Sequence, residues 1–146
     1  MGIGRRTAAA VMAVACGVLG VKALAQGRDT YKARLTALPA DARTRPGLAG
    51  TGSATATLAG TKLSISGTFE GLLSAATLAQ LHSAVAAGVR GPVIADLTVS
   101  KATSGSLAGA VDLTSQQIES LHKGGLYIQI HSEKAPDGVI WGWLVK

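Results

Sequence analysis

The apolar residues of this chain recur in short runs that alternate with polar residues and are separated by glycines. The clearest run is KLSISGTFE at residues 62–70, in which apolar residues or glycine occupy every second position. A period of two is typical of a β-strand with one buried and one exposed face. Because similar runs and turn-forming glycines continue from Thr30 to the end of the chain, the pattern indicates an antiparallel Greek-key sandwich or barrel.

The same pattern predicts an all-β fold of about eight strands, interrupted by one short helix. Thr114 and Gln117 have the spacing of a helix capping box, and Gly124 suits a helix end, so we expect a helix near residues 115–122. Pro- and Gly-rich residues 38–52 and glycine-bounded residues 84–91 are expected loops. The predicted strands are residues 31–35, 53–58, 62–69, 78–82, 92–99, 106–112, 126–131 and 139–145.

The C-terminal hairpin gives the most specific geometric expectation. Its sequence EKAPDGVIWGWLV, residues 133–145, contains a Pro-Asp-Gly segment that suits a three-residue loop. That loop predicts three opposed pairs, which are Ala135 with Val139, Glu133 with Trp141, and His131 with Trp143.

Alternation along this hairpin assigns its side chains to two faces. Leu126, Ile128, Ile130, Ile140 and Leu144 are expected to line the core. The opposite face, which we call the outer strip, is a candidate partner-binding surface because exposed aromatic side chains commonly anchor contacts with proteins or carbohydrates. The alternative is that a loop such as residues 38–52 covers the strip and makes a second small core. The outer strip consists of Tyr127, Gln129, His131, Trp141 and Trp143.

The first 25 residues have the organisation of an export signal. Arg5 and Arg6 precede an apolar run, and Ala23-Leu24-Ala25 resembles a cleavage site. A periplasmic or extracellular protein is expected, by an export route that the sequence leaves open. The alternatives are an uncleaved membrane anchor and a lipid anchor at Cys16. The expected organisation is a signal peptide at 1–25, an N-terminal strand and loop at 26–51 and the main domain at 52–146, with one structural domain over about 29–146.

The net charge and its distribution argue against a nucleic-acid partner. The formal net charge is +6, and loss of Arg5, Arg6 and Lys22 with the signal would lower it by three. Further basic residues are concentrated in residues 28–45, but no aromatic pattern accompanies them. We therefore predict no nucleic-acid partner.

Histidines are the remaining chemical candidates. Residue alternation places Gln80 and His82 on one face, and two imidazoles would converge if their strand lay beside that of His131. Copper or zinc sites usually take three or four ligands, and no cysteine follows residue 25. We therefore expect histidines that hydrogen-bond loops and no cofactor, with copper or zinc binding by His82 and His131 as the alternative. No nucleophile elbow or phosphate-binding loop is present, so no catalytic residue is predicted.

Residues 58–144 resemble the CHRD domain, a family named for chordin and also found alone in exported bacterial proteins. The resemblance is carried by LSISGTFEGLLS, AQLHSAVAAGVRGPVIADL, VDLTSQQIESLHKGGLYIQIHS and APDGVIWGWL, in that order. It implies a β-sandwich of the immunoglobulin or Cu,Zn superoxide dismutase type.

The resemblance also implies a role in non-catalytic interaction outside the cell. Gln80 and Gln129 replace a family histidine and asparagine, and Trp141 and Trp143 replace a family arginine and glutamine. The family's polar strip is thus an aromatic strip in this chain. Together with the residue patterns, the resemblance predicts an exported binding module whose partner is an unknown protein or carbohydrate.

Overall fold

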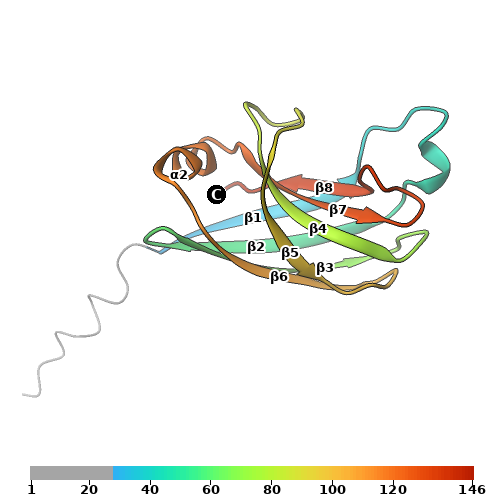
Figure 1. The fold of residues 1–146 in the computed structure, drawn as a ribbon, viewed down its shortest axis with the longest axis horizontal. Helices are drawn as coiled ribbons and strands as arrows, with labels where there is room; N and C mark the ends of the chain where they lie inside the picture. The colour runs from blue at the N-terminus through green and yellow to red at the C-terminus, as the bar shows by residue number, and fades with distance from the viewer. Residues whose placement is uncertain (1–27) are drawn as a thin grey trace, which may run out of the picture.

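The computed structural model describes residues 28–146, so the expected signal peptide and Cys16 lie outside the described part. Eight antiparallel strands close into a barrel in the order β1-β2-β3-β6-β5-β4-β7-β8 (Figure 1). All eight predicted strands and the all-β class are confirmed. The elements are β1 (Arg28–Ala37), η1 (Arg45–Gly47), β2 (Thr51–Ala59), β3 (Lys62–Glu70), β4 (Ala76–Ser83), β5 (Val93–Val99), β6 (Gly105–Asp112), α2 (Ser115–His122), β7 (Leu126–Ser132) and β8 (Ile140–Trp143).

The barrel interior is filled by the apolar face of each strand. In β3, Leu63, Ile65 and Phe69 are buried and the serines between them are exposed, as the period of two predicts. In β7, by contrast, almost every residue is buried, because its inner face meets the core and its outer face is covered. The predicted core face of the C-terminal hairpin is confirmed for all of its members, which are Leu126, Ile128, Ile130, Ile140 and Leu144.

The short helix α2 forms where its capping signal predicts it. The Thr114 hydroxyl accepts the Gln117 N–H at 3.2 Å, and the Gln117 side-chain oxygen accepts the Thr114 N–H at 2.9 Å. Gly124 follows the helix with a φ of 75°, a left-handed conformation that glycine adopts readily. The capping-box prediction is therefore confirmed. No helix among residues 28–146 has the length and apolar character needed to cross a membrane.

The predicted pairing of the C-terminal hairpin is wrong by four residues. Trp141 lies opposite Gln129, not Glu133, and Trp143 lies opposite Tyr127, not His131. The predicted Ala135–Val139 pair is also absent, because the Val139 N–H donates to the Ile130 carbonyl at 2.8 Å. Because the shift is an even number of residues, the assignment of side chains to the two faces is unchanged.

The pairing differs from the prediction because the connection between β7 and β8 is longer than the predicted three-residue loop. Ladder pairing ends at Ile130 and Ile140, and the intervening residues make two successive turns. Ser132 and Ala135 exchange backbone hydrogen bonds of 3.2 and 3.1 Å, and the Gly138 N–H then donates to the Ala135 carbonyl at 3.1 Å. The Pro-Asp-Gly segment therefore reverses the chain as expected, but it is only the second turn of a wider loop.

Two connections meet at one end of the barrel. Figure 1 shows the β1–β2 connection, which contains η1, beside the β7–β8 connection at the end opposite α2. The Leu38 N–H donates to the Val139 carbonyl at 3.1 Å and joins the two segments directly. Gly47 lies so close to the Lys134 carbonyl that an added Cβ would be 2.7 Å from its oxygen. These contacts define the end of the molecule where the candidate site lies.

Candidate functional site

The outer strip gathers its aromatic residues into one packed group. The ring centroids of Trp141 and Trp143 are 4.6 Å apart, and the Tyr127 ring lies 5.0 Å from Trp143 and 5.7 Å from Trp141. Leu38 and Ala84 pack against these rings and complete a second apolar cluster outside the barrel. Alternation along β7 and β8 therefore places these residues together, as predicted.

Most of the outer strip is covered. Tyr127 and Gln129 are each 1% exposed and Trp141 is 8% exposed, whereas His131 and Trp143 are half-buried. The structure thus matches the second-core alternative. Leu38, which covers the strip on one side, comes from the segment at 38–52 that the sequence suggested as a cover. The strip supports the surrounding loops, and only its half-buried members reach the surface.

A histidine–tyrosine pair holds the loop between β4 and β5 against the strip. His82 and Tyr127 stack with centroids 4.7 Å apart and ring planes at 11°. The His82 Nδ1 atom lies 2.9 Å from the Gly91 carbonyl, so it carries the proton and donates. The Gly91 N–H in turn donates to the Tyr127 hydroxyl at 3.0 Å. A side chain at Gly91 would overlap the Ser83 carbonyl, which explains the glycine.

This arrangement disfavours the protonated form of His82. Burial lowers the pKa of His82 below its ordinary value, the bond to Gly91 opposes that change, and electrostatic interactions with His131 and Arg90 lower it further. The His82 Nε2 atom is buried and has no hydrogen-bond partner among residues 28–146. A proton added there would therefore be an unsatisfied buried donor.

A second polar group ties the strip to the β7–β8 loop. The Asp137 carbonyl accepts two hydrogen bonds, from Gln129 Nε2 at 3.1 Å and from Arg90 Nη1 at 3.0 Å. His131 Nδ1 donates to the Pro136 carbonyl at 2.8 Å, which leaves its Nε2 to accept from Gln129 at 3.3 Å. Arg90 also lies over the Trp141 ring, 6.0 Å from its centroid. The β4–β5 loop and strand β7 are thereby both bonded to one carbonyl of the β7–β8 loop.

The two candidate metal ligands do not lie opposite each other. Strands β4 and β7 are neighbours, as a shared site would need, but His82 pairs with Tyr127 and His131 pairs with Leu78. The two positions are four residues apart along β7, or about 13 Å of strand. Within the described chain, no group of three or more His, Cys, Asp or Glu side chains could hold a metal ion. The expected hydrogen bonds from these histidines to loops are both present.

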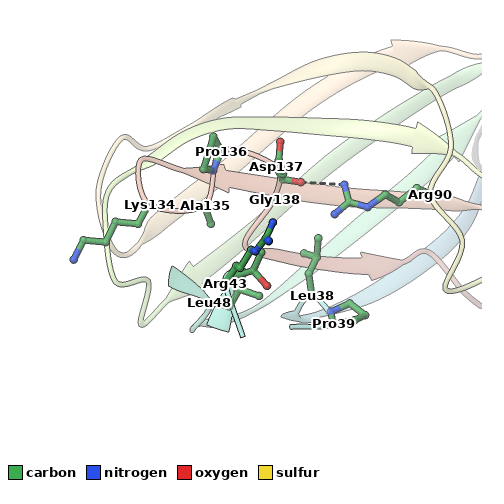
Figure 2. Close-up of a pocket in the computed structure, with 11 residues that line it drawn as sticks. Leu38, Pro39, Arg43, Leu48, Arg90, Lys134, Ala135, Pro136, Asp137 and Gly138 are labelled. Carbon is green, nitrogen blue, oxygen red and sulfur yellow. Dashed lines mark hydrogen bonds between the residues drawn. The ribbon is translucent and has the colours of Figure 1, made fainter. Parts of the chain in front are cut away.

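A cleft of about 130 Å³ lies beside the strip, which we call the cationic cleft. Its walls come from the β1–β2 connection, the β4–β5 loop and the β7–β8 loop (Figure 2). Both apolar and charged side chains line it. Its lining residues are Leu38, Pro39, Arg43, Thr44, Leu48, Arg90, Lys134, Ala135, Pro136, Asp137 and Gly138.

The arginine from the β1–β2 connection is positioned by a local turn. The Asp41 carboxylate accepts the backbone N–H groups of Arg43 at 2.8 Å and Thr44 at 2.9 Å. These bonds, with Thr44 contributing most, lower the pKa of Asp41. Because Asp41 binds only the backbone of Arg43, the guanidinium is left to face the cleft. Figure 2 shows Arg43 and Arg90 both extending toward the Asp137–Gly138 turn, with the Lys134 side chain directed outward.

Positive charge predominates in the cleft. Three cations line it against a single acid, Asp137. Among residues 28–146, Arg43, Arg90 and Lys134 take part in none of the ion pairs. Sequence reasoning missed this site because its cations are far apart along the chain, and the only signal was the basic bias of residues 28–45.

A family model of the CHRD domain matches residues 31–144, a span that includes β1 as well as the motifs noted from residue 58 onward. Neither the search of curated proteins nor the search of solved structures found a match. CHRD domains are a generally non-catalytic family, are typically extracellular and act as interaction modules.

Proposed function

Because this chain belongs to the CHRD family, we propose that it is an exported, non-catalytic binding module of the cell envelope that holds its partner at the cationic cleft. The observation that carries the proposal is the Asp137 carbonyl, which joins Arg90 and Gln129 at the cleft wall. This junction ties the β4–β5 loop and strand β7 to the β7–β8 loop, and the bond from the Leu38 N–H to the Val139 carbonyl adds the β1–β2 connection. A preformed surface binds with less loss of conformational entropy than a mobile one.

In this proposal the outer strip has a supporting role, with contact at its edge. Tyr127, Gln129 and Trp141 are buried and hold the loops, while the exposed parts of His131 and Trp143 adjoin the partner. This arrangement differs from direct contact through all five strip residues, because residues that are 1% or 8% exposed present almost no surface. The partner is an exported protein or a carbohydrate of the envelope.

Site-specific photo-cross-linking tests this function. A photoreactive amino acid is placed at Pro39, which lines the cleft, and separately at Ser66, which is exposed on the outer face of β3. In cells that export the protein, we expect a discrete cross-linked product from position 39 and none from position 66. Arg90→Gln should reduce that product. Equal products from both positions, or none from either, would contradict the proposal.

Copper or zinc binding by His82 and His131 is the second candidate. The observation in its favour is the buried His82 Nε2 atom, whose lone pair has no partner among the described residues. Metal analysis of the purified protein, compared with a His82→Ala, His131→Ala double variant, tests it. A stoichiometric metal that is lost in the double variant would establish this function, and an equal trace of metal in both would exclude it.

We further propose that the barrel is of the Cu,Zn superoxide dismutase or immunoglobulin type. Its support is the strand order, in which β3 lies beside β6 and β4 lies beside β7, so that two connections cross the ends of the barrel. An experimental structure that can be superposed on members of either type would test this assignment.

A further inference from the structure

The cationic cleft has a chemical character that narrows its ligand. Arg43 and Arg90 approach it from two separate loops, and both side chains extend toward the same turn (Figure 2). Each guanidinium presents a planar set of N–H donors that matches a carboxylate. Arg90 uses its Nη1 atom for the Asp137 carbonyl, and its other donors have no partner among residues 28–146. A matching ligand therefore carries a negatively charged group that accepts hydrogen bonds from both guanidinium groups.

Apolar residues supply the other half of the lining. Leu48 is half-buried and reaches the surface, whereas Leu38 and Ala135 are buried behind it and present little surface. Prolines at positions 39 and 136 add rigid apolar surface. An inorganic anion would leave this surface unused, whereas an aliphatic group attached to the anion would remove it from water at about 25 cal/mol per Å².

The size of the cleft sets the size of the ligand. Its volume of about 130 Å³ is below the roughly 300 Å³ or more of pockets that enclose a cofactor or a drug-sized molecule. A group of that volume is one aliphatic residue with its carboxylate. A larger ligand must extend out of the cleft past Lys134, whose ammonium group lies at the outer side.

We propose that the cationic cleft binds a carboxylate carried by a short aliphatic group, as in the last residue of a polypeptide or in a free aliphatic acid. Arg43 and Arg90 hold the carboxylate, and Pro39, Leu48 and Pro136 contact the aliphatic part. This inference rests on the proposed binding function and specifies the chemistry of the bound group. Lys134 adds long-range attraction, which salt screens beyond about 10 Å at 0.1 M.

Calorimetry with the purified protein tests the chemistry. The probes are N-acetyl-leucine, its neutral amide and sodium sulfate. We expect saturable binding of N-acetyl-leucine and at least about tenfold weaker binding of the other two, because the amide lacks the charge and sulfate lacks the aliphatic group. Equal binding of the amide would overturn the charged half of the proposal. Equal binding of sulfate would overturn the aliphatic half.

Variants locate the binding. Arg43→Gln should weaken binding of N-acetyl-leucine by about tenfold or more, whereas Arg45→Gln, an equal charge change in the neighbouring η1 segment, should have little effect. Arg43→Lys should recover only part of the loss, because an ammonium group lacks the planar fork. Unchanged thermal unfolding of each variant shows that the fold is retained. Equal loss in the Arg43→Gln and Arg45→Gln variants would mean general charge attraction and would reject the site.

A peptide distinguishes the two sources of the carboxylate. The tetrapeptide Gly-Gly-Ala-Leu with a free terminus binds more tightly than N-acetyl-leucine if the natural ligand is a polypeptide end, and equally if a free acid is sufficient. Both results support the cleft chemistry. Cross-linking at position 39 without carboxylate binding would remove this inference and leave the proposed function. Carboxylate binding without any cross-linked partner would support this inference and reject the proposed function.

Discussion

His82 stacks on Tyr127, and both side chains bind the backbone of one residue, Gly91, whose carbonyl accepts from His82 and whose N–H donates to Tyr127. The loop that carries Arg90 is therefore held to the barrel through its neighbouring glycine. Because Arg90 forms one wall of the cationic cleft, the buried pair helps to position that wall.

Stability should fall in mildly acidic solution because of His82. Its pKa is lowered in the folded state by burial, so as pH falls through about 6.5 the unfolded chain takes up a proton before the folded chain does. Stability is therefore fully present above that pH and is lost progressively down to the folded-state pKa. Urea unfolding between about pH 7.5 and pH 5 measures this loss.

A substitution series assigns the effect to His82. His82→Phe keeps an aromatic ring and removes the titration, so its stability should vary less with pH than that of the parent protein. His122, whose side chain is 49% exposed, provides the control, and His122→Gln should retain the parent's pH dependence. An identical pH dependence in the parent and in His82→Phe would mean that other groups are responsible.

Removal of the Tyr127 hydroxyl should loosen the Gly91 loop selectively. Tyr127→Phe retains the ring contacts with Trp141 and Trp143 but deletes the acceptor of the 3.0 Å bond from Gly91. We expect a loss of about 0.5–1.5 kcal/mol in the free energy of unfolding and faster amide hydrogen exchange at Gly91. Amide exchange at Ile128, in the centre of β7, should change only as much as the free energy of global unfolding changes. Unchanged protection of Gly91 would show that this bond does not hold the loop.

The features that the sequence predicted correctly are those that depend on local rules. Alternation in β3 identifies Leu63 and Ile65 as core because successive strand residues point to opposite faces. The Thr114–Gln117 box specifies the start of α2 because both hydrogen bonds lie within one turn of helix. The two faces of the β7–β8 hairpin follow from the same alternation, even though its pairing does not.

The features that it missed depend on contacts between distant segments. The wide β7–β8 loop is anchored to another segment, because the Val139 carbonyl accepts the Leu38 N–H. Residues 133–145 alone carry no information about that bond. Burial of the outer strip depends on contacts with Leu38 and Ala84. The cleft depends on three cations from separate segments, which are Arg43, Arg90 and Lys134. Barrel closure brings these segments together, and a residue pattern does not specify how the barrel closes.

Gly138 should be costly to replace. Its φ of 120° is unfavourable for other residues, and an added Cβ would lie 2.6 Å from Gln129 Nε2, the atom that binds Asp137. Gly138→Ala should lower the free energy of unfolding by about 2–4 kcal/mol. Gly88→Ala is the matched control, because its φ of 82° is also positive but nothing lies within 4 Å of the added Cβ. Denaturant titration of both variants should give about 1–2 kcal/mol for the control. Equal losses would show that backbone strain alone determines the cost.

Arg90 should shield Trp141 from solvent. The guanidinium carbon lies 6.0 Å from the Trp141 ring centroid, and the ring is 8% exposed. In a Trp143→Phe background, where Trp141 is the sole indole, we expect emission blue-shifted from that of free tryptophan and weak quenching by acrylamide. Arg90→Gln in that background should increase the quenching, because it removes the cover and the bond to Asp137 that holds the loop in place. Acrylamide is neutral, so the altered charge does not itself change the quencher concentration near the ring, and Arg45→Gln should leave quenching unchanged. Strong quenching before Arg90 is replaced would mean that the strip is open in solution, and the buried support for the cleft would then be absent.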